Sequence, residues 1–393
     1  MKRNFFRLLL SAVLMMCCTT SWALHGERGG TYVGNYGKDG CDFDLYTDYS
    51  YTYEGVTKSF SGKCAVVTRF YNKNSTIHET ITKDGVTYTV VAIGEDAFAS
   101  FDEVGVLTVP SSVRVLEAFA FDGNEDNLSE LILADGSEDL FCYRSTNDNG
   151  AFTWNAGLKK VYIGRNLHYQ GEEGGEEYFA PFYKGDFTDL KVTIGPLVTE
   201  IPNYCFYGKA SSSSYGVSSI DFSKATSLQS IGKRACYDND LLTEVNLTAY
   251  KELRIWLEAF DDCDKLTKVT LMGNGTSASA CSVDASAFYG CSSLETVSME
   301  GVTKIDEYAF NDCDKLSKVI FLSNTPPTFD QNCFDASSDN IHFYVKTDFL
   351  TGTYGAAYDF KGKLKSYPRN MMLRYQTTDG KAIPIGGDCK YSS

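Results

Sequence analysis

The sequence is poor in the residues from which catalytic and metal sites are usually built. Its 393 residues include four histidines, which stand far apart and without metal-ligand spacing: His25, His78, His168 and His342. It has no Cys-x-x-Cys pair, no nucleophile elbow and no glycine-rich phosphate loop. We therefore expect no catalytic residue, cofactor or bound metal. The 51 acidic residues leave a hydrolytic carboxylate pair open on counting alone.

Long apolar runs are also missing. The longest lies in residues 1–23, where three basic residues precede the apolar stretch Leu8 to Met16 and Ser-Trp-Ala follows. This pattern predicts a secretory signal peptide cleaved near Ala23, because spanning a membrane needs ~20 apolar residues. Lipidation at Cys17 is less favoured, since methionines precede it where small residues are usual. We expect an exported protein, secreted or attached to the cell surface, without a membrane span.

Positive charge is in deficit. The formal net charge is −15, and removal of the basic leader would make the exported chain more negative still. Such a surface repels nucleic acid and anionic lipid, so neither is an expected partner.

What the sequence does contain is an internal repeat. AFDDCDKLTKV at Ala259 to Val269 recurs as AFNDCDKLSKV at Ala309 to Val319, with AFYGCSSLETV between them. Writing the unit as I-G-x-x-A-F-x-x-C-x-x-L-x-x-V-x-I identifies about ten copies with these anchor residues: Phe98, Phe121, Phe152, Phe182, Phe206, Cys236, Phe260, Phe288, Phe310 and Phe334. A period of roughly 20 to 30 residues predicts a solenoid, in which each unit buries its apolar face against its neighbours.

The letters within one unit predict its local structure. L-x-x-V-x-I alternates and is typical of a short strand, and stacked strands would form a parallel β-sheet on one face. I-G-x-x-A-F reads as a turn, with Ala and Phe as interior plugs. We therefore predict a repeat solenoid of the leucine-rich type, with turns and short second strands opposite the sheet.

The repeat resembles the BspA-like class of bacterial leucine-rich repeats, found on surface proteins of bacteria in mucosal and gut communities. The resemblance covers roughly Val66 to Pro368. It implies a non-enzymatic protein that binds other proteins and adheres to host matrix or to other bacteria. Several units carry insertions, among them Phe182 to Leu190, and these depart from the family pattern.

Four segments follow from these patterns: a leader (1–23), an N-terminal region (24–65), the solenoid (66–368) and a tail (369–393). The N-terminal region is dense in tyrosine and is expected to cap the first coil, an aromatic surface for sugars being the alternative. Lys83-Asp84-Gly85 predicts a hairpin turn leading into the first clear unit. The tail predicts a strand pair around Asp379-Gly380, as if a further segment began there.

The thirteen cysteines are mostly explained by the repeat. Cys263, Cys291 and Cys313 occupy one position, three residues after the anchor, where other units carry asparagine. In leucine-rich repeats these two residue types interchange as small groups that satisfy the backbone, so buried thiols are expected. Cys41 with Cys64, in the N-terminal region, is the one disulfide that we expect. Pairing between cysteines of neighbouring coils is left open, because stacking could bring their Cα atoms within the ~7 Å that a disulfide needs.

The exposed strand residues are the candidate binding surface, because stacked strands present one side chain per coil at equivalent points. Five represent it: Lys160, Tyr162, Lys268, Thr270 and Lys318, with Ile320 expected beside them. The favoured function is protein binding in adhesion. A glycan-binding or glycan-degrading accessory protein is the alternative, and a structural array without a specific ligand is a third.

Overall fold

The computed structural model describes most of the chain from residue 26 to residue 345 and three strands beyond it. The described ranges are 26–71, 76–98, 105–121, 128–144, 150–175, 177–208, 215–273, 280–323, 325–330, 332–334, 337, 340–345, 364–366, 373–376 and 382–385. The expected leader and the turn at Asp379-Gly380 lie outside them. The chain divides into two compact units, unit 1 (residues 1–241) and unit 2 (residues 242–393).

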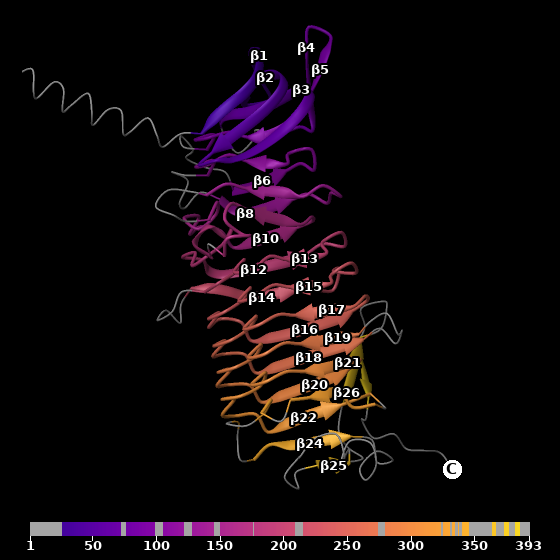
Figure 1. Cartoon of the computed structure of the whole chain (residues 1–393). Coiled ribbons are helices and arrows are strands. Elements are labelled where there is room, and N and C mark those ends of the chain that lie inside the picture. The colour runs from indigo at the N-terminus through magenta and orange to yellow at the C-terminus, as the bar shows by residue number, and fades with distance from the viewer. Residues whose placement is uncertain are drawn as a thin grey trace, which may run out of the picture. The chain divides into compact units, whose positions relative to one another are not determined.

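Unit 1 contains two stacks of parallel strands (Figure 1). The longer strands form one sheet, here the long-strand sheet of unit 1: β6 (Gly105–Val109), β8 (Leu128–Leu133), β10 (Lys160–Ile163), β12 (Thr188–Ile194) and β14 (Gly216–Asp221). Short strands form the second stack: β7 (Val115–Leu116), β9 (Leu140–Cys142) and β11 (Leu167–Tyr169), with β13 (Glu200–Ile201) and β15 (Ser230–Ile231) paired separately. One 3-10 turn, η3, covers Glu177–Phe179.

The N-terminal strands continue the short-strand sheet of unit 1. They are β1 (Glu27–Lys38), β2 (Cys41–Tyr53), β3 (Val56–Phe70), β4 (Thr80–Lys83) and β5 (Val86–Ile93). β1, β2 and β3 are antiparallel, and β3 then pairs in parallel with β5, which pairs with β7. The hairpin turn between β4 and β5 is confirmed, with Asp84 and Gly85 at φ of 51° and 77°. The capping role of this region stays a prediction.

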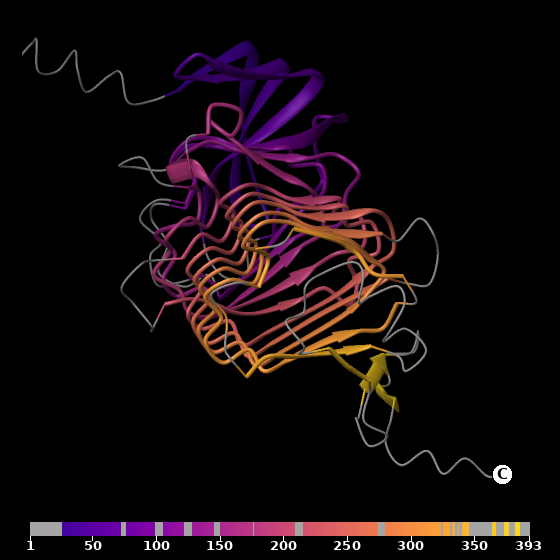
Figure 2. The ribbon, with the colours of Figure 1, turned by 60° about the horizontal axis from the view of Figure 1, so that its bottom comes forward.

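Unit 2 repeats the arrangement more regularly, and Figure 2 shows its strands stacked turn upon turn. Its long-strand sheet consists of β16 (Glu244–Ala249), β18 (Lys268–Gly273), β20 (Thr296–Glu300), β22 (Lys318–Phe321), β24 (His342–Val345) and β25 (Leu364–Ser366). Its short strands are β17 (Leu253–Ile255), β19 (Cys281–Val283), β21 (Val302–Ile305) and β23 (Thr328–Phe329). β26 (Leu373–Gln376) and β27 (Ala382–Ile385) form the strand pair expected in the tail. The predicted solenoid with parallel sheets is confirmed.

Phenylalanine ladders fill the interior. In unit 1 the ladder begins at Phe70, which stacks on the first anchor. It continues through the anchors Phe98, Phe121, Phe152, Phe182 and Phe206, with neighbouring ring centroids 4.7 to 5.2 Å apart. In unit 2, Phe260, Phe288, Phe310 and Phe334 lie almost parallel at 5.1 to 5.4 Å. All of them are buried, so each of these turns removes one large ring from water, whereas the turn of Cys236 has a thiol in that place.

Many turns bend through left-handed backbone beside the anchor, and the turns of Cys236, Phe260, Phe288 and Phe310 do so on both sides of it. Two residues before the anchor, φ lies between 51° and 59° at Asp96, Phe119, Tyr204, Arg234, Glu258, Ser286 and Tyr308. Two residues after it, φ lies between 47° and 66° at Lys184, Asp238, Asp262, Gly290 and Asp312. Hydrogen bonds between turns hold this conformation: the N–H of Tyr204 donates to Lys233 O (2.9 Å) and that of Ser286 to Glu307 O (3.0 Å). Neighbouring turns therefore stabilise a backbone that few non-glycine residues adopt alone.

The position three residues after the anchor donates a hydrogen bond to the previous turn. Cys291 Sγ donates to Phe260 O and Cys313 Sγ to Phe288 O, both at 3.3 Å. Asn239 Nδ2 donates in the same way to Phe206 O at 2.6 Å. Cysteine and asparagine thus interchange there because each supplies a small buried donor.

The disulfide expected between Cys41 and Cys64 is not formed. Both cysteines are free and buried, and the register of β2 with β3 pairs Cys41 with Phe70 and Cys64 with Tyr46. Since five residues of β2 separate Cys41 from Tyr46, the two thiols are on the order of 17 Å apart. A disulfide needs Cα atoms within ~7 Å, so the prediction was wrong.

Candidate interaction surfaces

Tyr162 is fixed on the outer face of the long-strand sheet of unit 1. Its hydroxyl donates to Asp135 Oδ1 at 2.7 Å, and Lys224 Nζ lies 5.8 Å from its ring centroid. A side chain at Gly195 would come within 2.8 Å of that hydroxyl, so the glycine makes room for it. Burial, then the hydrogen bond to Asp135, raises the pKa of Tyr162 to about 12, and the hydroxyl stays a donor at neutral pH.

Charged and apolar side chains surround this tyrosine. The strand register places Lys160 between Glu130 on β8 and Lys191 on β12. Lys160 Nζ lies 3.7 Å from the Glu130 carboxylate, and both side chains are solvent-accessible. Ile132 is the neighbour of Tyr162 on β8, and Val106 on β6 is 53% exposed. This face therefore combines one aromatic ring, held by a hydrogen bond, with apolar and charged neighbours.

The outer face of the long-strand sheet in unit 2 carries mainly polar side chains. One in-register row crosses five strands: Glu244, Lys268, Thr296, Lys318 and His342. Lys268 and Lys318 are two strands apart, which corresponds to roughly 10 Å. Thr270 and Ser298 lie side by side in the next row and are partly exposed. Unit 2 therefore presents two lysines beside small side chains that carry hydroxyl groups.

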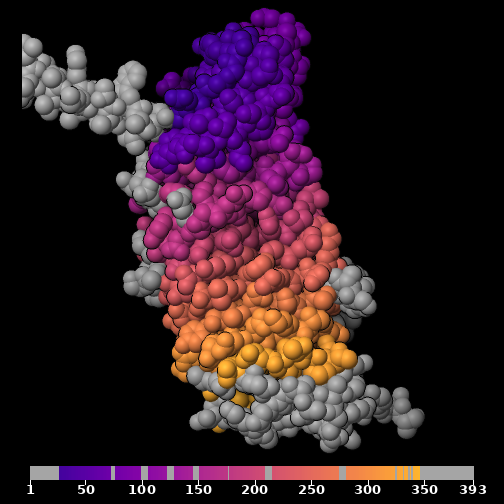
Figure 3. Space-filling view, viewed as in Figure 1, coloured from indigo at the N-terminus to yellow at the C-terminus, as the bar shows by residue number. Residues whose placement is uncertain are grey.

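The five predicted surface residues belong to two different sheets, one in each unit. Lys160 and Tyr162 belong to unit 1, and Lys268, Thr270 and Lys318 to unit 2. Ile320, expected to be exposed, is 3% exposed, because β22 buries both Ile320 and its neighbour Phe321 where simple alternation would expose one of them. Figure 3 shows one face of the molecule with all its atoms, coloured by position along the chain.

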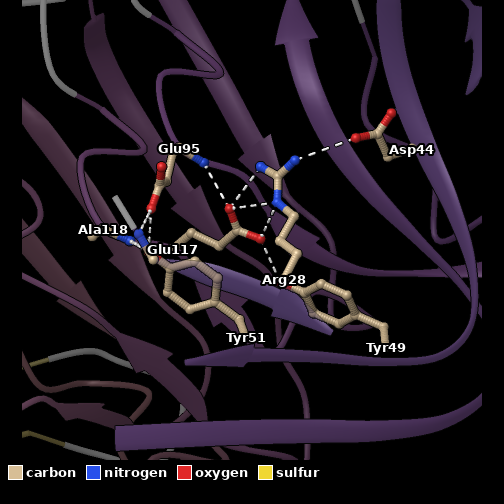
Figure 4. Close-up of polar contacts among 8 residues, drawn as sticks. Arg28, Asp44, Tyr49, Tyr51, Glu95, Glu117 and Ala118 are labelled. Carbon is tan, nitrogen blue, oxygen red and sulfur yellow. Dashed lines mark hydrogen bonds and ion pairs between the residues drawn. The ribbon is translucent and has the colours of Figure 1, made fainter. Parts of the chain in front are cut away.

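A buried ionic network that the sequence did not indicate joins β1 and β2 to the first turns of unit 1 (Figure 4). Arg28 Nε and Nη2 donate to the carboxylate of Glu117 at 2.7 to 3.0 Å, and the Tyr49 hydroxyl donates to the same carboxylate. The Tyr51 hydroxyl donates to Glu95 Oε1 at 2.6 Å. The side chain of Glu117 is inaccessible to solvent.

The members of this network satisfy one another's charges and hydrogen-bonding groups. Burial acts to lower the pKa of Arg28, but the hydrogen bond and charge of Glu117 outweigh it and raise that pKa. Burial, together with Glu117, raises the pKa of Tyr49. The Glu117 carboxylate accepts hydrogen bonds from Arg28, from Tyr49 and from the backbone N–H of Glu95 (2.9 Å).

The sequence suggested that His168 is isolated, but in the structure it contacts three carboxylates. Its Nδ1 lies 3.0 Å from Glu172 Oε2, and its Nε2 lies 3.2 Å from Asp139 and 3.6 Å from Glu200. The hydrogen bond to Glu172, opposed by burial and aided by the other two carboxylates, raises the pKa of His168 to about 8. A protonated imidazole therefore links carboxylates from three successive turns.

Two features are absent from the part of the chain that the structure describes. Among these residues, no group of three or more His, Cys, Asp or Glu side chains is placed to hold a metal ion. Within the same residues, no helix is long and apolar enough to cross a membrane.

Comparisons with known proteins identify the repeat. No curated protein matches the chain. Among solved structures, a leucine rich cell surface protein from Faecalibacterium prausnitzii is 16% identical, with 86% of this chain and 95% of that chain covered and a TM-score of 0.37. The pneumococcal vaccine antigen PcpA is 14% identical, with 86% and 99% covered and a TM-score of 0.29. A leucine-rich repeat protein from Bacteroides ovatus is 17% identical, with 85% and 100% covered and a TM-score of 0.25.

A family model matches most of the repeat itself. The model of the BspA type leucine rich repeat region matches in six copies over residues 68–211, 180–282 and 255–359. These ranges cover well over half of the chain and the anchors of both phenylalanine ladders. The chain therefore belongs to the family of BspA type leucine rich repeat proteins.

Proposed function

We propose that the chain is an exported, non-enzymatic surface protein that binds other proteins through the outer faces of its long-strand sheets, in adhesion to host matrix or to other bacteria. The observation that carries this proposal is Tyr162, whose ring is fixed by Asp135 and flanked by Lys160 and Ile132. A rigid tyrosine loses little conformational entropy on binding, which is why such residues dominate interface energetics.

The polar row of unit 2 supports the same function. Lys268 and Lys318 lie on either side of Thr296 in one row, and Thr270 and Ser298 lie in the next row. Membership of a leucine-rich-repeat surface-protein family is consistent with protein interaction. The export step rests on the predicted signal peptide, and the non-enzymatic character on the sequence's lack of catalytic motifs.

A binding screen tests the proposal. The chain from Leu24 onward would be presented to immobilised matrix proteins and to a panel of host and bacterial glycans. We expect saturable binding to a protein that weakens at least tenfold in Tyr162→Ala or in the Lys268→Glu/Lys318→Glu double variant. Lys304→Glu is the matched control, because Lys304 is exposed on the short strand β21.

Two outcomes would contradict the proposal. Binding to a glycan that is indifferent to all three variants would favour the glycan-binding alternative. Protein binding that Lys304→Glu weakens as much as the sheet-face variants do would show that net charge, and not these faces, determines the affinity.

A further inference from the structure

A glycine-rich segment follows β11 in unit 1, and we call its residues 170–175 the strap. Its sequence is Gln-Gly-Glu-Glu-Gly-Gly, so half of its residues are glycines. Gly171 and Gly175 have φ of 82° and 75°, a conformation that glycine adopts without strain. Because glycine loses more conformational freedom than any other residue when it is ordered, the strap needs contacts with the rest of unit 1 to stay closed.

Two side chains of the strap make such contacts. At its first residue, Gln170 Nε2 donates to Glu54 Oε2, in the turn between β2 and β3, at 3.3 Å. Two residues later, Glu172 Oε2 lies 3.0 Å from Nδ1 of His168 on β11. The side chain of Glu173 is exposed, and glycines make up the rest. Glu172 is therefore the side chain that ties the middle of the strap to the short-strand sheet.

His168 lies among carboxylates from three elements. Besides Glu172 of the strap, Asp139 directly before β9 approaches its Nε2 at 3.2 Å, and Glu200 on β13 at 3.6 Å. In the described part of the chain, no lysine or arginine forms an ion pair with any of these three carboxylates. The imidazolium is thus the cation that holds them together, and once it is neutral they repel one another.

His168 is the group around the strap that titrates near neutral pH. Its hydrogen bond to Glu172, opposed by burial and aided by the nearby carboxylates, raises its pKa to about 8. Cys142 and Tyr169 also face Glu172, but burial raises the pKa of both thiol and phenol, so both stay neutral. Burial raises the pKa of Glu200 as well.

We propose that the strap is a pH-sensitive closure, which His168 holds through Glu172 while the imidazole is protonated and which opens when the imidazole becomes neutral. Because the pKa of His168 is higher in the folded chain than in the unfolded chain, the tether is strongest below pH 6.5 and is lost as pH rises through about 8. Opening also loosens the contact of Gln170 with Glu54. This device does not depend on the proposed binding function, so each can fail without the other.

Hydrogen exchange of the strap amides tests the proposal, with the chain from Leu24 onward at pH 6.5 and pH 8.5 and each rate compared with the intrinsic rate at that pH. The reporters are the N–H groups of Gln170, Glu172 and Gly175, each of which donates to a backbone carbonyl. We expect them to be at least tenfold less protected than the amides of β10, because the strap opens locally. Their protection should fall about fivefold at the higher pH, the partial exposure of His168 limiting the effect.

Two substitutions separate the charges from the shape of the contact. His168→Lys supplies a cation at both pH values and should make the protection of the strap independent of pH. Glu172→Gln keeps the shape of the side chain but removes its charge, and should give at pH 6.5 the low protection that the natural chain shows at pH 8.5. His78→Gln is the matched control, because His78 pairs with Asp39 and makes no contact with the strap.

Three results would overturn the proposal. Equal protection of the strap at the two pH values in the natural chain would show that the imidazole does not hold it. A fall that persists in His168→Lys would assign the pH dependence to another group. Strap amides that are as protected as those of β10, and that change in step with them, would show that the strap opens only when unit 1 unfolds. If His168→Lys does not fold, Glu172→Gln decides the question, and natural protection at pH 6.5 in that variant would contradict the tether.

Discussion

At the scale of single residues, the left-handed positions of the turns are places where a substitution introduces backbone strain. Gly290 occupies such a position at φ 66°, and a Cβ there would meet Asp262 Oδ1 at 2.2 Å. We expect Gly290→Ala to lower the free energy of unfolding by about 1 to 2 kcal/mol from backbone strain alone, with the steric contact adding to it. Urea denaturation would measure the change, and a loss below about 0.5 kcal/mol would show that the turn relaxes freely.

His168 gives a second prediction at this scale. Its pKa is raised from 6.5 to about 8, so its contribution to stability is complete below pH 6.5 and is lost as pH rises through about 8. The groups facing it are Asp139, Glu172 and Glu200, which repel one another once the imidazole is neutral. Because the side chain is 34% exposed, solvent screening reduces the effect to about 1 kcal/mol.

The unfolding midpoint should therefore fall between pH 6.5 and pH 8.5, and His168→Gln should remove that part of the pH dependence. NMR titration of the imidazole would place the pKa directly. An unshifted pKa near 6.5, or an unchanged pH profile in His168→Gln, would contradict the ionic role of this residue.

At the scale of elements, the N-terminal strands are held by the buried contact of Arg28 with Glu117. Removing one partner of a buried ion pair leaves an uncompensated charge and typically costs about 3 to 5 kcal/mol. We expect Glu117→Ala to destabilise the protein by that order and to increase hydrogen exchange in β1 and β2 most. Glu138→Ala is the matched control, because the pair of Glu138 with Arg114 is exposed and worth about 0 to 1 kcal/mol. Equal losses in the two variants would show that Glu117 acts through something other than its burial.

The hydrogen-bond donor three residues after the anchor can be tested by replacing a cysteine with the asparagine that another turn carries there. Cys313→Asn should be tolerated, because Asn239 makes the equivalent hydrogen bond to the preceding anchor in unit 1. Cys313→Val keeps the apolar volume but removes the donor, leaving the carbonyl of Phe288 without it, and should cost about 1 to 2 kcal/mol. Thermal unfolding of both variants provides the comparison, and equal midpoints would argue that only side-chain size matters at this position.

The same elements show how far the sequence alone could predict the structure. The repeat predicted the solenoid and its anchors, because an apolar residue that recurs once per turn is removed from water when the turns stack on one another. It could not predict left-handed backbone at Glu258 or Ser286, since neither residue type favours it and hydrogen bonds between turns impose it. The contact of Arg28 with Glu117 joins residues 89 apart, for which local spacing carries no signal. The disulfide prediction failed because strand register, and not proximity in sequence, separates Cys41 from Cys64.

At the scale of the whole molecule, ten described cysteines are distributed over both units, and all of them are free and buried. Burial raises the pKa of Cys142 in unit 1 to about 12 and that of Cys281 in unit 2 to about 12. Because the thiolate is the reactive form, these thiols should resist alkylation until the surrounding turns open.

Alkylation followed by peptide mass spectrometry would then report the opening of each unit separately. A repeat array is stabilised by contacts between neighbouring turns, so a defect should open the turns nearest to it first. We expect Glu117→Ala to accelerate labelling of Cys142 at least tenfold while the rate at Cys281 changes little. Equal acceleration at both cysteines would instead show that the chain opens in one cooperative step, and that the two units unfold together despite being separately compact.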